Sequence, residues 1–390
     1  MIAATALKIE NQQKIFFPNL DAFRFISFLL VFWFHVNKVV FVNLKDQPIY
    51  SFLDRVFGNG ELGVNFFFVL SGFLITYLLL QEKKINGRIH ILNFYARRIL
   101  RIWPLFYLSV FIGFIVFPLI KNFAGLVPSE NANPIYYLFF LNNFDYINNW
   151  PLFPDALSLI VLWSVAVEEQ FYLVWPIALA FLKQRLYPVL FFAVIAGSLI
   201  FRSFYISESS HNNAVLYFHT FSVIGDLAVG ALIAYYSFSE GRFYKWIRQL
   251  GRGSIILLYL IAIIIILFKN EIFHNQYLLL LERLIIATVF GLLILEQNYS
   301  KNSFFKLGKW KTVSQLGKYT YGLYCYHFMV ISISANVVLK FGTGKDSLFS
   351  SILAALISLI VTVIISYFSF KYFERPFLKL KNRFSFIVKE

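Results

Sequence analysis

The sequence predicts an all-α integral membrane protein, a bundle of about ten transmembrane helices. Hydrophobic residues make up 59% of the 390 residues and charged residues only 14%, whereas soluble domains have about 45–50% and about 25%. The apolar residues also gather in blocks about 20 residues long, the length that crosses a bilayer as a helix. Within lipid a helix satisfies its own backbone hydrogen bonds, so we expect these blocks to be helical.

The apolar blocks follow one another without a long polar insert, so we expect one polytopic membrane domain over residues 1–390, with no appended soluble domain. The first block is too long for a signal-peptide core and no small-residue cleavage site follows it, so it is expected to remain as a helix. The expected spans are 18–41, 62–80, 102–120, 160–182, 187–205, 217–237, 254–268, 278–296, 319–340 and 350–372.

The basic residues favour a topology with both termini in the cytoplasm. With the N-terminus inside, the inner segments hold 25 of the 35 Lys and Arg residues and the outer segments hold eight. Such an excess is typical of the cytoplasmic side of a membrane protein, and it accounts for the net charge of +15 without a nucleic-acid partner. We therefore expect a multi-pass protein of the inner or plasma membrane, surrounded by membrane lipid. The outer loop 121–159 contains an aromatic, Asn-rich run that could pack back onto the membrane.

The first span carries three ionisable residues, Asp21, Arg24 and His35. Charges inside a bilayer cost at least about 2.5–3.5 kcal/mol each and often mark functional sites. Arg24 and His35 are about three helical turns apart and share one face, which places His35 roughly 16 Å further outward than Arg24. The alternative is that Asp21 pairs locally with Arg24, while His35 is a buried polar residue that bonds a backbone carbonyl.

The fourth span carries Ser164, Glu168 and Glu169. Helical rise places Glu168 about 12 Å below the outer end of its helix and His35 about 9 Å below the end of its own. We therefore expect the two side chains at one depth, where a carboxylate would orient the imidazole as a general base. Ser164 lies one turn above Glu168 on the same face, and Glu169 points about 100° away. The alternative is that these acids only neutralise intramembrane cations.

A pair of arginines, Arg98 and Arg101, lies where a cytoplasmic segment enters the third span. Residues three apart share a helix face, and guanidinium groups suit phosphate oxygens. The alternative is an anchor that only sets the topology.

Two further residues, Asp226 in the sixth span and His327 in the ninth, are weaker candidates, each with a structural polar contact as its alternative. Gly63 and the Ser71-Gly72 pair in the second span are expected to permit close helix contact. The single cysteine, Cys325, excludes a disulfide within the chain. The sequence has no Walker loop, dinucleotide fingerprint or zinc-ligand spacing, and we expect no metal site.

Taken in order, these segments resemble the acyltransferase-3 family of membrane acyltransferases. The sequence departs from that family at Asn65, where members usually have an acidic residue. The matching motifs extend from residue 20 to residue 377: Leu20-Asp-Ala-Phe-Arg24 with ten residues before His35, Gly63 to Ile75, Arg98-Ile-Leu-Arg101 followed by Trp-Pro, Trp163-Ser-Val-Ala-Val-Glu168, Tyr319 to His327, and Tyr372-Phe-Glu-Arg-Pro-Phe377.

The resemblance implies an enzyme that moves an acyl group, most often acetyl, from cytoplasmic acyl-CoA to a hydroxyl group of a cell-surface carbohydrate. Acyl-CoA would be the donor substrate, with no permanently bound cofactor. CoA is rich in phosphate, which fits Arg24, Arg98 and Arg101 as donor-binding residues. His35 would be the catalytic base or a transient acyl carrier, with Glu168 orienting it.

Some members of the family append a soluble hydrolase-like domain that completes the transfer. Because none is expected here, either the membrane domain acts alone or it passes the acyl group to a separate extracytoplasmic protein. The alternative function is a polysaccharide or lipid-linked sugar transporter or flippase, which would work without acyl-CoA. The sequence shows no broken helix pair of the kind that transporters use.

Overall fold

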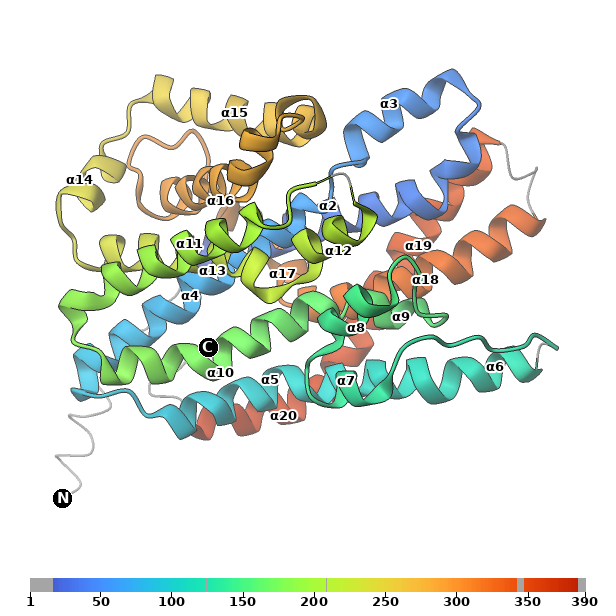
Figure 1. The fold of residues 1–390 in the computed structure, drawn as a ribbon, viewed down its shortest axis with the longest axis horizontal. Coiled ribbons are helices and arrows are strands. Elements are labelled where there is room, and N and C mark those ends of the chain that lie inside the picture. The colour runs from blue at the N-terminus through green and yellow to red at the C-terminus, as the bar shows by residue number, and fades with distance from the viewer. Residues whose placement is uncertain (1–16, 124, 208, 342–346, 385–390) are drawn as a thin grey trace.

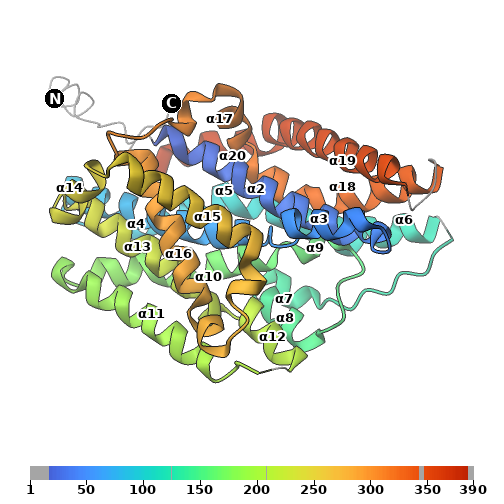
Figure 2. The same ribbon diagram turned by 90° about the horizontal axis from the view of Figure 1, so that it is seen from above.

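The fold is a bundle of long helices, most of which lie along the horizontal of Figure 1, whereas α16 crosses the bundle steeply in Figure 2. The computed structural model describes residues 17–123, 125–207, 209–341 and 347–384, and these residues contain no strand. Ten helical segments among them are long and apolar enough to cross a membrane. This confirms the all-helical prediction and the predicted number of spans.

The main helices of the ten segments agree with the predicted spans to within a few residues at most ends. The largest difference is at α5, which begins eleven residues before the predicted start at residue 102. The bounds are α2 (Pro18–Val39), α4 (Leu62–Asn86), α5 (Ile91–Phe111), α10 (Trp163–Phe181), α11 (Tyr187–Ser203), α13 (Thr220–Phe238), α15 (Arg252–Ile272), α16 (Gln276–Tyr299), α18 (Thr320–Phe341) and α19 (Leu348–Phe368).

Shorter helices join or extend these segments, and the sequence analysis predicted none of them as a separate helix. A π turn, η2 (Ile112–Val116), continues α5 into α6 (Phe117–Phe123), and a second, η5 (Ser369–Glu374), continues α19 into α20 (Arg375–Lys381). The other short α-helices are α3 (Pro48–Phe57), α7 (Pro134–Leu138), α8 (Asn142–Asn149), α9 (Leu157–Ile160), α12 (Ser210–Phe218), α14 (Arg242–Arg248) and α17 (Lys311–Gly317).

The aromatic, Asn-rich run of the outer loop packs back onto the helices. It forms α7 and α8, where the Tyr137 hydroxyl donates to the Tyr146 hydroxyl at 2.9 Å and Tyr146 donates to the Leu159 carbonyl at 2.6 Å. The amide of Asn143 donates to the Phe218 carbonyl at 3.1 Å. Buried polar groups must be satisfied within the protein, so this loop is anchored to α9 and α12.

Close glycine contacts place α4 at the centre of the bundle. A Cβ atom at Gly72 would lie 1.9 Å from the Leu227 carbonyl oxygen of α13, and one at Gly230 would lie 2.1 Å from the Val69 carbonyl oxygen of α4. A Cβ at Gly63 would lie 2.3 Å from the Ser27 carbonyl of α2. The backbones therefore approach more closely than any larger residue permits. This confirms the prediction for Gly63 and Gly72, and it fixes α4 between α2 and α13.

Candidate active site

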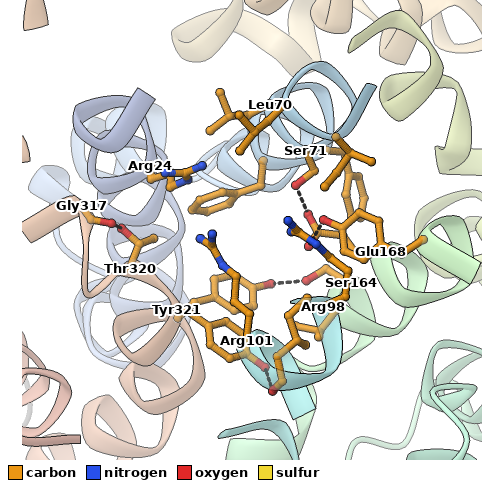
Figure 3. A pocket seen from close by; sticks show the side chains of 18 of the residues that line it. Arg24, Leu70, Ser71, Arg98, Arg101, Ser164, Glu168, Gly317, Thr320 and Tyr321 are labelled. Carbon is orange, nitrogen blue, oxygen red and sulfur yellow. Dashed lines mark hydrogen bonds between the residues drawn. The ribbon is translucent and has the colours of Figure 1, made fainter. Parts of the chain in front are cut away.

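A cavity opens among α2, α4, α5, α10 and the first turns of α18 (Figure 3). Its empty volume is about 930 Å³, including its open mouth. The walls combine apolar side chains with a polar set that consists of Arg24, Ser71, Arg98, Arg101, Ser164, Glu168, Tyr172, Lys318, Thr320, Tyr321 and Tyr324. Five of the predicted site residues thus line one cavity: Arg24, Arg98, Arg101, Ser164 and Glu168.

Positive charge dominates one side of this cavity. Arg24 comes from α2, Arg98 and Arg101 come from α5, and Figure 3 shows their guanidinium groups turned towards the same space. Arg24 pairs with Asp21 one turn away, as the local alternative expected, yet it also lines the cavity. Within the described residues, no carboxylate forms an ion pair with Arg98 or Arg101, and the buried Nε of Arg98 has no hydrogen-bond partner. These donors are therefore available to an anionic ligand.

The Arg98 guanidinium is held in place by aromatic rings. Its central carbon lies 5.6 Å from the ring centres of both Phe94 and Tyr172. Cations over aromatic faces are attracted by the ring quadrupole. Arg98 is therefore positioned without the use of its hydrogen-bond donors.

Glu168 of α10 lines the same cavity as the arginines and lies beside Arg98 in Figure 3. Its carboxylate accepts a hydrogen bond from the Ser71 hydroxyl at 2.5 Å and one from the Tyr172 hydroxyl at 3.2 Å. The prediction that Glu168 orients His35 is therefore wrong. Helical rise gave both residues a similar depth, but it did not show which neighbouring helix each side chain meets. Ser71 on α4 is the residue that meets Glu168.

His35 pairs with the second candidate histidine. Its Nδ1 lies 2.9 Å from Nε2 of His327 on α18, and the Nδ1 of His327 lies 2.7 Å from the Tyr324 carbonyl oxygen. His35 is partly exposed, whereas His327 is fully buried. The side chain of Tyr324 lines the cavity and its hydroxyl lies 2.7 Å from that of Ser164. Neither histidine lines the cavity itself; the pair is connected to it through His327, which bonds the backbone of the lining residue Tyr324.

The comparison with known protein families agrees with this constellation. The acyltransferase-3 family model, described as an acyltransferase domain, matches residues 17–371, nearly the whole chain. This chain belongs to the acyltransferase-3 family.

Two relatives give the scale of the similarity. The acyltransferase-3 chain is 26% identical over 373 residues to the peptidoglycan O-acetyltransferase OatA of Listeria monocytogenes. The aligned region covers 93% of this chain and 56% of the relative. The chain is also 26% identical over 381 residues to the YrhL protein of Bacillus subtilis, with coverages of 94% and 56%. The chain therefore spans a little over half the length of these curated relatives. No solved structure matches it.

Two of the weaker candidates lie outside the cavity of this acyltransferase domain. Glu169 does not line the cavity; it accepts a hydrogen bond from the Trp103 indole at 2.9 Å, and its second carboxylate oxygen is buried without a partner. Asp226 pairs with Arg283 at 2.5 Å in a separate group of buried charges. Asn65, the position that departs from the family, donates to the same Asp226 carboxylate at 3.2 Å.

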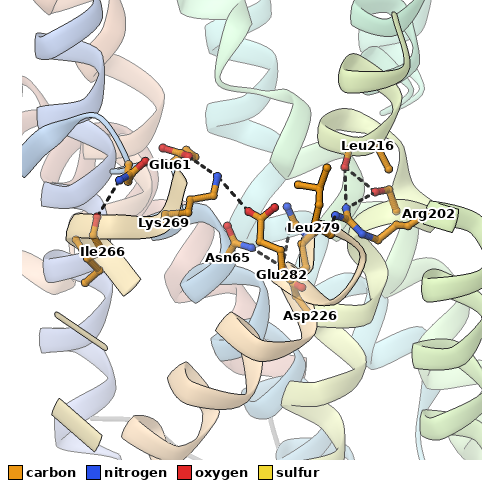
Figure 4. Close-up of polar contacts among 12 residues, drawn as sticks. Glu61, Asn65, Arg202, Leu216, Asp226, Ile266, Lys269, Leu279 and Glu282 are labelled. Carbon is orange, nitrogen blue, oxygen red and sulfur yellow. Dashed lines mark hydrogen bonds and ion pairs between the residues drawn. The ribbon is translucent and has the colours of Figure 1, made fainter. Parts of the chain in front are cut away.

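This separate group, drawn in Figure 4, joins helices on another side of α4. Lys269 of α15 pairs with Glu61 at 2.8 Å and with Glu282 at 3.1 Å. Arg202 of α11 donates to the Ser222 hydroxyl at 3.0 Å and to the Leu279 carbonyl at 2.9 Å. Each of these charged groups has a partner, as buried charges require, so the group ties α15 and α16 to the central bundle.

The cavity is also lined by residues that the sequence analysis missed or interpreted otherwise. Tyr172 lies one turn after Glu168, a spacing at which side chains meet on a helix, so it could have been found. Ser71 was interpreted only as a packing residue. Tyr324 gave no signal of its own within its aromatic segment, and Lys318 was counted only towards the topology.

Proposed function

We propose that this acyltransferase moves an acyl group, in the simplest case acetyl, from acyl-CoA to a hydroxyl group of a cell-envelope carbohydrate such as peptidoglycan. One observation carries the proposal: three arginines converge on a cavity that is also lined by Tyr324, and the Tyr324 carbonyl accepts a hydrogen bond from His327, the partner of His35. The name of the OatA relative supports the acceptor class and the acetyl group.

The arginine side suits the donor. CoA carries several phosphate groups, and guanidinium groups bind phosphate oxygens through paired, charge-assisted hydrogen bonds. The 25-to-8 distribution of basic residues favours a cytoplasmic position for this side of the cavity, where acyl-CoA is made. Lys318 adds a fourth positive charge to the lining.

The histidine side suits the transfer step. A sugar hydroxyl attacks a thioester slowly unless a base takes its proton while the new bond forms, and imidazole is matched to this task near neutral pH. In the proposed reaction, Nε2 of His35 takes the hydroxyl proton while the oxygen bonds the thioester carbonyl carbon. The carbon–sulfur bond then breaks, and the departing thiolate receives the proton from His35.

A binding measurement tests the donor side. Arg98→Ala and Arg101→Ala should each weaken acetyl-CoA binding to the purified protein about 10- to 100-fold, because a hydrogen bond to a charged group contributes about 1.5–3 kcal/mol. Arg88→Ala is the matched control, since Arg88 is exposed and does not line the cavity. Unchanged affinity in both cavity variants would reduce the pair to a topology anchor.

A mass spectrum of the envelope glycans, recorded with and without the gene, tests the reaction itself. We expect acylated sugar residues only when the gene is present, with a mass difference of one acyl unit. Unchanged glycan masses together with altered export of the glycan would favour a transporter instead.

A further inference from the structure

His35 is held by a second histidine instead of a carboxylate. The two rings come from α2 and α18, and Nδ1 of His35 lies 2.9 Å from Nε2 of His327. Within the described part of the chain, neither ring has a carboxylate as a hydrogen-bond or ion-pair partner. The usual partner of a histidine base is therefore replaced here by a neutral imidazole.

The hydrogen-bond network assigns the protons of this pair. A carbonyl oxygen can only accept, so the Nδ1 of His327 must carry the proton that reaches the Tyr324 carbonyl at 2.7 Å. In a neutral imidazole, Nε2 of His327 is then an acceptor. Nδ1 of His35 must therefore donate, which leaves Nε2 of His35 without a proton.

We propose that His327 is a positioning residue that fixes His35 in the tautomer whose Nε2 is free to act as the base. This inference rests on the proposed role of His35 in acyl transfer. A histidine held in the opposite tautomer would present a protonated Nε2 to the acceptor hydroxyl and could not take its proton.

Aromatic packing fixes the direction of both rings. The His35 ring is stacked on Phe328, with ring centres 4.2 Å apart and planes inclined by 26°. The His327 ring meets Phe28 edge-on, with centres 5.7 Å apart and planes at 89°. The rings thus lie among apolar neighbours, and the polar groups beside His35 are His327 and the backbone carbonyl of Val31, one turn earlier in α2.

The pair also gives the proton a second place to reside during transfer. When Nε2 of His35 takes the hydroxyl proton, the Nδ1 proton can shift along the 2.9 Å contact to His327. The positive charge is then shared by two rings, and His327 still donates to the Tyr324 carbonyl. Both shifts reverse when His35 releases the proton to the thiolate, so the pair returns to its starting state.

Two substitutions separate the positioning role from a packing role. His327→Gln places an amide oxygen near the position of Nε2 and keeps an acceptor for His35. His327→Leu fills the apolar surroundings but accepts no hydrogen bond. The tautomer is read by ¹⁵N NMR of protein labelled in the histidine rings, and the His35 signals are assigned by their loss in His35→Gln.

We expect wild type and His327→Gln to show an unprotonated Nε2 in His35, whereas His327→Leu shows a mixture of tautomers. The kcat of His327→Leu should fall at least about tenfold, but by less than the about 10²- to 10⁴-fold that a general base supplies. His327→Gln should restore most of this loss, and the KM for acyl-CoA should not change in either variant. If the leucine variant does not fold, His327→Asn replaces it, because its shorter amide does not reach His35.

The inference is overturned if His35 shows the same single tautomer in His327→Leu, or in His327→Asn, as in wild type. One further outcome would contradict only the proposed function. If His35→Ala leaves acyl transfer intact while the tautomer of His35 still depends on residue 327, the positioning is real but His35 is not the base.

Discussion

His35 is the residue at which binding and chemistry should separate. It is not among the residues that line the cavity and is only partly exposed, while the arginines that suit the donor line the cavity, Arg98 and Arg101 from α5 and Arg24 from further along α2. We expect His35→Ala to lower the transfer rate about 10²- to 10⁴-fold while acetyl-CoA binding stays within about twofold of wild type. Single-turnover transfer and equilibrium binding on the same preparation measure the two effects. A loss of rate below about tenfold is too small for a general base.

The two adjacent acids of α10 provide a matched pair. Glu168 faces the arginines and accepts hydrogen bonds from Ser71 and Tyr172, whereas Glu169 lies outside the cavity against Trp103. We expect Glu168→Gln to lower kcat/KM about tenfold or more, because hydrogen bonds to a charged group contribute about 1.5–3 kcal/mol. Glu169→Gln keeps an acceptor for Trp103 and should have a small effect on kcat/KM. A larger loss in Glu169→Gln than in Glu168→Gln would mean that the reaction depends on Glu169, outside the cavity, and not on Glu168.

Much of this site was predictable because helical spacing and motif order depend on local sequence. The common face of Arg98 and Arg101, and the turn that joins Ser164 to Glu168, both follow from the period of one helix. The partner of His35 was not predictable in this way. His35 and His327 are 292 residues apart in the chain, and their contact depends on how α2 packs against α18.

At the scale of the helix, the close contact between α4 and α13 depends on glycine, which has no side chain. An added Cβ at Gly72 would lie 1.9 Å from the Leu227 carbonyl oxygen, whereas one at Gly197 of α11 would meet no atom within 4 Å. We expect Gly72→Ala to destabilise the protein by about 1–3 kcal/mol, since the helices must move apart. Gly197→Ala should be neutral or stabilise it by up to about 1 kcal/mol. Thermal unfolding in detergent measures both, and equal midpoints would contradict the close contact.

Hydropathy predicts the helices that must be long and apolar enough to cross the bilayer. All ten spans were predictable for this reason, whereas the early start of α5 was not. The first turns of α5 carry Arg97, Arg98 and Arg101. These charges lie before the apolar block that predicts the span, but arginine is compatible with a helix, so the helix begins earlier. Short elements such as α3 and α8 were missed because each buries only part of its surface, which leaves no continuous apolar block.

The topology of the whole molecule can be tested with single cysteines, because the native Cys325 is buried. Asn131, His211, Lys245 and Lys311 are exposed in the connections between spans. With both termini in the cytoplasm, cysteines at positions 131 and 211 should react with an impermeant thiol reagent in intact cells. Cysteines at positions 245 and 311 should react only after the membrane is opened. The reverse pattern would invert the orientation and place the arginine side of the cavity outside the cell.

The buried charges that tie α15 and α16 to the bundle have a consequence for the order in which the protein assembles. During synthesis, α13 enters the membrane before α16, so Asp226 must wait for Arg283, its partner at 2.5 Å. Lys269 reaches Glu282 within its own hairpin, but it needs α4 to meet Glu61. An unpaired charge in a bilayer costs at least about 2.5–3.5 kcal/mol. This penalty is relieved only when the hairpin of α15 and α16 packs against the bundle. The insertion of the eighth span, α16, therefore stabilises the earlier helices as well as itself.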